Sequence, residues 1–134
     1  MCIRDRFIVV REKSILEQMS HSRSFGAQPL AKADAAIVVI GDAEKSDTWI
    51  EDCSIAMMDM HLMAHSLGIG SCWIQGRSRE AEDGHSTEAY LRNLLGYPES
   101  YQLLATLSLG MPNESKAPAE VDALPEEKIH WEQY

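Results

Sequence analysis

Short apolar runs alternate with amphipathic segments along this chain of 134 residues. Four runs have the length and the β-branched content of buried strands: Phe7–Val10, Ala35–Ile40, Ser71–Ile74 and Leu103–Leu109. Between them, apolar residues recur three and four positions apart, which is the spacing of one face of a helix. This alternation predicts an α+β domain in which helices cover a central sheet.

The strongest helical pattern lies between Thr48 and Gly68. Apolar side chains recur there at steps of three or four: Ile50, Cys53, Met57, Met60, Ala64 and Leu67. Thr48 and Glu51 have the spacing of a capping box at a helix start, and Gly68 stands where a left-handed residue would end the helix. We therefore predict a helix of about five turns with one broad buried face.

Shorter elements complete the predicted pattern. Helical spacing follows the first strand in REKSILEQMS (11–20), and residues 21–34 are expected to form a loop or a short irregular helix. The pair Gly41–Asp42 is a turn signal after the second strand. Ser86 can cap a helix over Thr87–Leu95. The buried side of this helix is expected to carry Tyr90, Leu91, Leu94 and Leu95.

The two ends of the chain differ in character from its middle. Residues 1–6, MCIRDR, read like a translated sequencing adaptor, so we expect a non-native leader there and one domain over residues 7–134. Residues 110–134 are Pro-rich and polar and include one aromatic anchor, Trp131. This arm has no core of its own and is expected to pack across another surface, such as a second copy of the chain.

Charge and composition exclude several classes of partner. The formal net charge is −9 and lysines and arginines do not cluster, which argues against a nucleic-acid partner. The longest apolar run is far shorter than a membrane span, which predicts no membrane partner. Three cysteines without a CxxC pair, and no secretory leader, favour a reducing, cytoplasmic setting.

Side chains that could carry chemistry are few. His61 and His65 are four residues apart on the long helix and could share a metal, but no HExxH pattern or evident third ligand accompanies them, so packing or exposure is favoured. Cys53 and Cys72 look like small buried hydrophobes rather than reactive thiols. Four of seven methionines lie at residues 57–63, where core or interface packing is favoured over a flexible groove. We predict no catalytic side chain and no metal site.

Glycines crowd the segment SLGIGSCWIQG (66–76), and Gly70 and Gly76 could let the main chain approach another group closely. We expect the amides of Ile74, Gln75 and Gly76 to leave the strand ladder and to face a flat heteroaromatic ligand, for which a flavin is suited. The alternative is a tight turn whose amides contact water.

These residues resemble a known family. The run DTWIEDCSIAMMDMHLMAHSLGIGSCWIQGRSR (47–79) is similar to the FMN-dependent nitroreductase superfamily, in its small single-domain branch. FIVVREKSILEQMS, ADAAIVVIGD and the tail from LLATLSLG onward agree with it. The resemblance implies a three-layer α/β/α sandwich with a mixed central sheet, and a homodimer with FMN at the subunit interface. It also implies ping-pong hydride transfer from NAD(P)H to a small-molecule acceptor such as a nitroaromatic or quinone.

The resemblance also assigns cofactor-binding positions. Gln75 and Gly76 match the residues whose main-chain amides face N5 and O4 of the flavin, and Trp73 and Ile74 match the wall beside the ring. Lys116 matches a basic residue that reaches the FMN phosphate, although the usual second basic residue is not seen. A Gly76→Val substitution is accordingly expected to obstruct the ring and to lower flavin occupancy.

The start of the chain departs from the family pattern. The N-terminal helix and the Arg-Arg-Ser-type segment that precede the first strand in family members are not seen in this sequence. We therefore expect a chain that lacks its N-terminal helix and binds FMN weakly or not at all. The alternative function is a non-catalytic flavin or small-ligand binding module, or an inactive fragment that keeps only a dimerisation surface.

Overall fold

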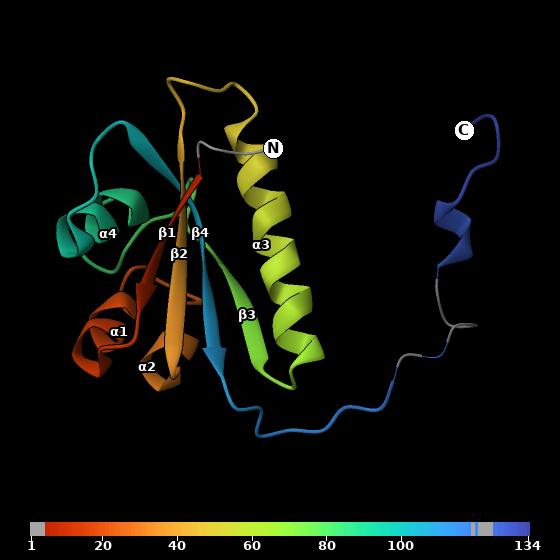
Figure 1. Cartoon of the computed structure of the whole chain (residues 1–134), viewed down its shortest axis with the longest axis horizontal. Coiled ribbons are helices and arrows are strands. Elements are labelled where there is room, and N and C mark those ends of the chain that lie inside the picture. Colours follow the sequence, from red (N-terminus) through yellow and green to blue (C-terminus); the bar gives the residue numbers. More distant parts are fainter. Residues whose placement is uncertain (1–4, 119, 121–124) are drawn as a thin grey trace.

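A four-stranded antiparallel sheet forms the centre of the computed structural model, which describes residues 5–118, 120 and 125–134 (Figure 1). Its strands are β1 (Asp5–Val10), β2 (Ala35–Asp42), β3 (Gly70–Gln75) and β4 (Tyr101–Gly110). They lie in the order β1-β2-β4-β3, so β4, the last of the described strands, occupies an interior position and β3 is an edge. All three pairings are antiparallel, and the expectation of a mixed sheet is wrong for these strands.

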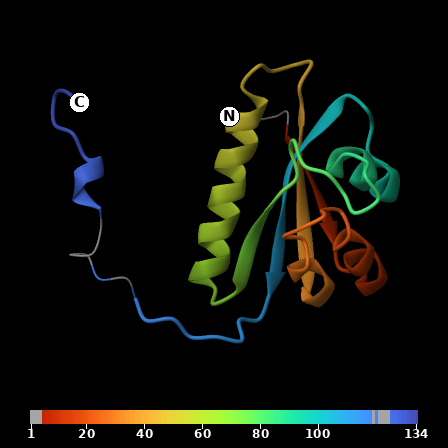
Figure 2. The ribbon, with the colours of Figure 1, turned by 180° about the vertical axis from the view of Figure 1, so that it is seen from behind.

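Helices cover both faces of this sheet, which confirms the three-layer α+β architecture (Figures 1 and 2). The helices are α1 (Lys13–Met19), α2 (Pro29–Lys32), α3 (Trp49–Ser66), α4 (Thr87–Leu95) and the short 3-10 turn η2 (Glu126–Lys128). The helices α1, α2 and α4 lie on one face, and α3 alone lies on the other. Among the described residues, no helix combines the length and the apolarity needed to cross a membrane.

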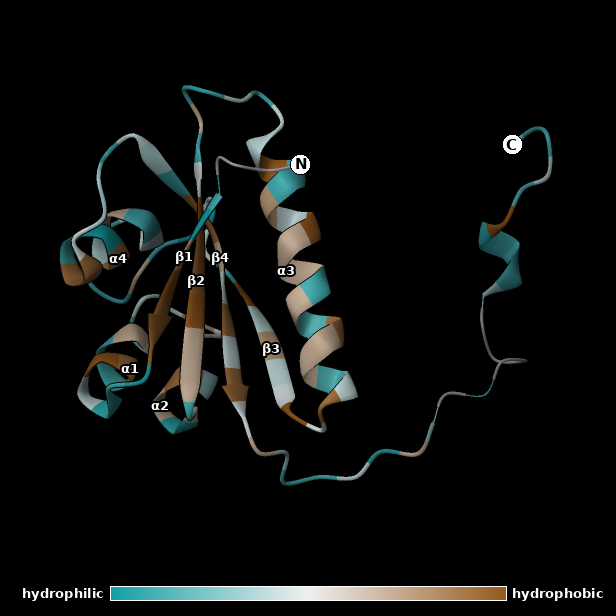
Figure 3. Cartoon of the chain, viewed as in Figure 1, coloured by the Kyte–Doolittle hydropathy of each residue, from teal (hydrophilic) through white to brown (hydrophobic). Residues whose placement is uncertain are grey.

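Each face of the sheet has its own apolar core. Leu16, Leu30, Val38, Ile74, Leu91 and Leu103 belong to the core beneath α1, α2 and α4. Val39, Trp49, Cys53, Met57, Ala105 and Leu107 belong to the core beneath α3. Figure 3 shows the hydrophobic colouring concentrated in β1 and β2, and polar segments spaced along α3. The interior strands β2 and β4 therefore bury side chains on both faces, as their continuous apolar runs predict. The strand β1 is an edge of the sheet, and its Phe7 and Val9 are exposed, so the prediction of a buried first strand is wrong on one face.

The ends of α3 agree only in part with the sequence pattern. Gly68 adopts the predicted left-handed conformation, with φ +72°, and its amide donates to the carbonyl of His65. The next amide, Ile69, donates to Ala64, which completes a Schellman cap. The predicted capping box is wrong, because the Thr48 side chain makes no cap hydrogen bond. Leu67 was expected on the buried face, but it is exposed because it follows the last helical turn.

Gly41 explains how α3 approaches the sheet. A turn was expected at Gly41–Asp42, but both residues continue β2 and pair with Gln102 and Tyr101. A Cβ on Gly41 would lie 2.8 Å from Cε3 of Trp49 and 2.9 Å from Sγ of Cys53. The glycine therefore makes room for the first turns of α3 rather than for a turn of the main chain.

Other sequence predictions are confirmed. The helix α4 has the predicted bounds, and the Ser86 side chain accepts from the Ala89 amide at 3.1 Å. Asp5 and Arg6 belong to β1 and pair with β2, whereas residues 1–4 of the expected leader lie outside the described residues. After Gly110 the chain extends away from the sheet as an arm (Figure 1). The described part of this arm contains only η2 as regular structure.

Candidate functional site

The edge strand β3 offers main-chain donors that the sheet does not use. Gly76 follows the strand, and its amide donates to the carbonyl of Leu104 at 3.2 Å. In an antiparallel ladder, residues alternate between those that bond the neighbouring strand and those that face away from it. The register pairs Gln75 with Ala105 and Trp73 with Leu107, so the amides of Ser71, Trp73 and Gln75 face the open edge.

The structure thus corrects two parts of the amide prediction. Ile74 lies within β3 opposite Thr106, and the alternation directs its amide to β4 rather than to the open edge. The amide of Gly76 is not free, and the Arg77 amide also donates to the Leu104 carbonyl, at 2.8 Å. Leu104 is the extra residue of a β-bulge in β4, where the register shifts between Val39 and Ile40. The bulge gathers two donors on one carbonyl and ends β3 there, which leaves Gln75 as the last outward amide.

Gly76 has a packing role that the sequence did not suggest. A Cβ at this position would lie 2.4 Å from Cδ2 and 2.8 Å from Cγ of Leu103, a residue without solvent exposure. The Leu103 side chain therefore occupies the space that a side chain at position 76 would need. At the other end of β3, a Cβ on Gly70 would lie 3.5 Å from Cα of Pro112, so the start of the arm also runs close to this strand.

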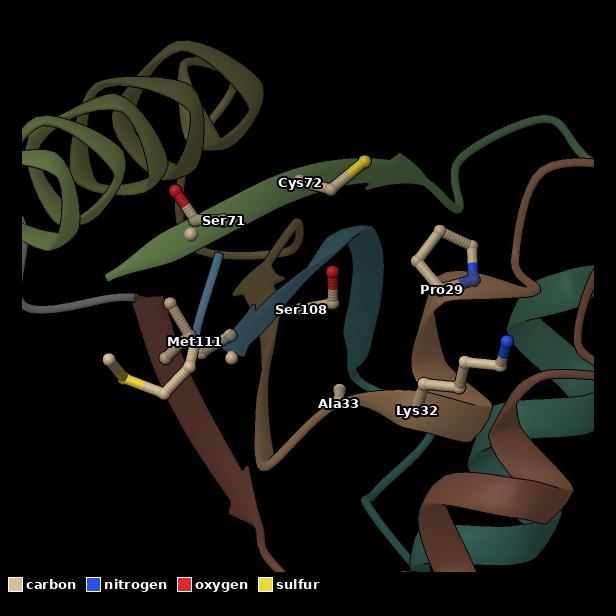
Figure 4. A pocket seen from close by; sticks show the side chains of 10 residues that line it. Pro29, Lys32, Ala33, Ser71, Cys72, Ser108 and Met111 are labelled. Atoms are coloured by element: carbon tan, nitrogen blue, oxygen red, sulfur yellow. The ribbon is translucent and has the colours of Figure 1, made fainter. Parts of the chain in front are cut away.

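A groove of about 310 Å³ lies between α2 and the edge of the sheet (Figure 4). The α2 side contributes Pro29, Lys32 and Ala33, and the strand side contributes Gly70, Ser71, Cys72, Ser108, Leu109, Gly110 and Met111. Cys72 and Ser108 are directly paired across β3 and β4, and their side chains border the groove together. The sequence pattern does not indicate this groove, because its walls come from three distant parts of the chain, within residues 29–33, 70–72 and 108–111.

Two polar groups in the groove lack an internal partner. Ser108 is only 5% exposed, and its hydroxyl has no hydrogen-bond partner among the described residues. Lys32 forms no ion pair within the described part of the chain. A hydroxyl that reaches the groove without an internal partner and an unpaired ammonium are suited to a ligand that carries oxygen or nitrogen acceptors and negative charge.

The wall of the groove at Ala33 is fixed by a neighbouring charge. The Lys13 ammonium donates to the Ala33 carbonyl at 2.6 Å and lies 3.2 Å from the Asp34 carboxylate. The hydrogen bond from Lys13, followed by its positive charge, lowers the pKa of Asp34. Asp34 therefore stays ionised and paired with Lys13, which leaves Lys32 as the cation that borders the groove.

Two of the predicted wall residues lie apart from this groove. Ile74 is 2% exposed and belongs to the core beneath α1, α2 and α4. Trp73 is 36% exposed, and strand alternation places it on the α3 face, opposite Cys72. Its indole donates to the Gln75 side chain at 2.9 Å.

Lys116 lies in the arm and borders a second cavity, of about 390 Å³, together with His65, Gly70 and Pro112. Its ammonium is 2.9 Å from the Glu114 carboxylate. The structure therefore brings Lys116 near the first residue of β3, whereas Gln75 ends the strand about 17 Å further on at the rise of an extended chain. The role of Lys116 at a phosphate stays a prediction.

The structure shows the hydrogen-bond partner of His61 and the burial of Cys53 and Cys72. His61 Nδ1 lies 2.6 Å from the Ser71 hydroxyl, so this ring joins α3 to β3. Cys53 is fully buried as predicted. Cys72 is exposed rather than buried, because it lies on an edge strand. Among the described residues, no three metal-ligating side chains of His, Cys, Asp or Glu gather in one place.

Comparison with known proteins gives a consistent picture. The model of the Nitroreductase family matches residues 6–111. A protein of Archaeoglobus fulgidus that is named as an NADH dehydrogenase/NAD(P)H nitroreductase is 40% identical over 133 residues, which cover 96% of this chain and 73% of that protein. The match therefore leaves about a quarter of that relative without a counterpart here.

Solved structures show the same likeness. An FMN-dependent nitroreductase from Clostridium difficile superposes with a TM-score of 0.94 at 39% identity, over 98% of this chain and 76% of that one. A structure from Bacteroides thetaiotaomicron, also named as an NADH dehydrogenase/NAD(P)H nitroreductase, gives a TM-score of 0.85 at 29% identity, over 98% and 73% of the two chains.

Proposed function

This chain belongs to the nitroreductase family, and from that premise we propose that it is an FMN-dependent NAD(P)H oxidoreductase acting on nitroaromatic, quinone or similar small acceptors. The observation that carries the proposal is the outward-facing Gln75 amide at the end of an edge strand whose opposite end borders a groove with an unpaired Lys32. The FMN-dependent relative at 39% identity supports the choice of cofactor.

The groove residues Lys32 and Ser108, and the separate Gln75 amide at the other end of β3, carry groups that suit a flavin. The Gln75 amide would donate to the redox-active edge of the ring, where hydrogen bonds tune its potential. The Lys32 ammonium would balance negative charge on the bound cofactor, and the Ser108 hydroxyl would bond one of its polar atoms. Lys116 is proposed as a further cation for the phosphate. Bound FMN would supply hydride transfer from NAD(P)H to the acceptor, and no side chain of the chain is required as acid or base.

Binding and reduction of flavin test this function directly. The 134-residue protein would be titrated with FMN, and quenching of flavin fluorescence would give the dissociation constant. NADH or NADPH would then be added without oxygen, and we expect loss of the flavin absorbance between 350 and 500 nm. Micromolar binding would contradict the expectation, drawn from the start of the chain, of weak or absent binding. Binding without reduction would favour the non-catalytic module, and no binding at all would favour the inactive fragment over an enzyme formed by this chain alone.

We also propose that the protein functions as a homodimer that shares the cofactor clefts. The side of α3 that faces away from the sheet carries an apolar stripe of Ile55, Met58 and Leu62, which are 61%, 49% and 56% exposed. Their spacing of three and four residues aligns them on one face of the helix. A contiguous exposed apolar face is typical of an interaction surface, and a second copy of the same helix would cover it.

The mass of the protein in solution tests this assembly. Met58→Glu places a charge in the middle of the α3 stripe, so we expect it to shift the mass measured by light scattering from dimer to monomer. Phe25→Glu is the matched control, because Phe25 is also exposed but lies in the loop before α2. A wild-type monomer at all concentrations would contradict the proposal.

A further inference from the structure

We propose that Trp73 is a positioning residue, which acts through the Gln75 side chain to fix the end of β3 and the direction of the Gln75 amide. The inference rests on the proposed flavin site and adds a residue that reaches the cofactor only indirectly. It also assigns a purpose to an indole that would otherwise be a half-exposed aromatic on an edge strand.

Two hydrogen bonds connect the three alternate residues at the end of this strand. The Trp73 indole nitrogen donates to Oε1 of Gln75 at 2.9 Å. The Gln75 side-chain nitrogen then donates to the carbonyl of Arg77 at 3.2 Å. The carboxamide of Gln75 thus uses both its acceptor and its donor, and it bridges the last part of β3 to the first residue beyond Gly76.

The main chain at the same point is held from the other side. The carbonyl of Leu104 accepts from both Gly76 and Arg77. Arg77 is therefore bound through its amide to β4 and through its carbonyl to the Gln75 side chain. An edge strand normally frays at its end, because only one side has a ladder partner. Here the side-chain bridge replaces the missing partner and leaves the outward amide of Gln75 unobstructed.

The chemistry of the indole distinguishes positioning from packing. Trp73 belongs to neither of the two buried clusters. Phenylalanine would preserve an aromatic surface there but cannot donate a hydrogen bond. A role in packing therefore predicts little change in Trp73→Phe, whereas a positioning role predicts that the strand end loosens. A preorganised donor is effective because it does not need to be ordered when the ligand binds.

The first measurement uses the protein without flavin. Hydrogen exchange would be followed by NMR at the amides of Gly76 and Arg77 in wild type and in Trp73→Phe. Loss of one neutral hydrogen bond predicts faster exchange at these two amides by about two- to tenfold. Trp131→Phe is the matched control, because the Trp131 indole has no hydrogen bond in the described part of the chain. We expect no change at Gly76 or Arg77 in that variant.

The second measurement uses FMN as the probe. Trp73→Phe is expected to weaken FMN binding by about two- to tenfold. The midpoint potential of bound FMN should rise, because an amide facing N5 favours the oxidised ring, whose N5 accepts a hydrogen bond. In a Gln75→Leu background, Trp73→Phe should have no further effect on either quantity, since the bridge is already absent.

The outcomes separate the two proposals. The positioning role is overturned if Trp73→Phe matches wild type in exchange at Gly76 and Arg77, or if it binds FMN as tightly as wild type. It is also overturned if the effects of Trp73→Phe and Gln75→Leu simply add. A wild-type protein that fails to bind FMN overturns the proposed function instead, and the exchange comparison still decides whether Trp73 holds the strand end.

Discussion

Replacing Gly76 by alanine should destabilise the fold rather than block a ligand. The added Cβ would lie 2.4 Å from Cδ2 of Leu103, whereas carbon atoms in ordinary contact are about 3.5 Å apart. The leucine must therefore retreat by about 1 Å within a core where it has no exposed surface. Overpacking of this kind costs about 1–3 kcal/mol, which exceeds the gain of less than about 1 kcal/mol from replacing glycine.

Thermal unfolding measures this effect. A loss of 1–3 kcal/mol corresponds to a fall in Tm of about 3–15 °C for a chain of this length. Gly110→Ala is the control, because its Cβ would lie at an ordinary 3.6 Å from the nearest side-chain atom, Oδ2 of Asp34. A Leu103→Ala background should cancel part of the penalty, since the new methyl group then fills space that the leucine has left.

The result also decides between two roles for this glycine. The sequence resemblance implies that Gly76 must be small so that a flavin ring can approach, and it predicts that Gly76→Val lowers flavin occupancy. The structure predicts unfolding at a lower temperature before any ligand is added. If Gly76→Ala keeps the wild-type Tm but loses FMN binding, the packing argument is refuted.

Three further comparisons test individual side chains. Lys32→Ala should weaken FMN binding more than Lys116→Ala, because only the first ammonium lacks a carboxylate partner among the described residues; equal losses in a fluorescence titration would contradict this. Ser86→Ala should lower the unfolding free energy by about 0.5–2 kcal/mol, whereas Thr48→Ala should cost less because its hydroxyl caps no helix amide; urea unfolding measures both. The hydrogen bond from Lys45 lowers the pKa of Asp42 below its ordinary value of 3.8. The ionised Asp42 therefore stabilises the fold above pH 3.8, and this stabilisation is lost as the pH falls through the lowered pKa. The Tm difference between wild type and Asp42→Asn should therefore shrink between pH 6 and pH 3.

The sequence pattern predicted most of the fold for physical reasons. The runs of β2 and β4, which are buried on both faces, and the 3.6-residue period of α3 indicate one sheet between helices. The cap residues Ser86 and Gly68 act as their types suggest, because a serine hydroxyl can accept an amide and glycine tolerates positive φ. The pattern failed at Gly41, which was expected to form a turn. This glycine instead lies within β2, and its lack of a side chain leaves room for α3 to pack against the strand.

The candidate site was less predictable than the fold. The sequence indicates the candidate segment that ends at Gln75. It cannot show which amides donate hydrogen bonds to β4, because that depends on the bulge at Leu104. The groove residues Lys32 and Ser108 come together only through tertiary packing. The Trp73–Gln75 bridge could have been anticipated, since residues two apart in a strand share a face and their side chains are complementary.

The interior position of β4 has a consequence for folding during synthesis on the ribosome. β4 is the last strand to be synthesised, yet β2 and β3 each rely on it as a neighbour. A nascent chain that ends before Tyr101 can form only the β1–β2 pair, and β3 then has no strand beside it. The sheet should therefore complete its folding only after residues Tyr101–Gly110 have been synthesised, and a chain that stops before them should be degraded by proteases rather than form a smaller stable domain.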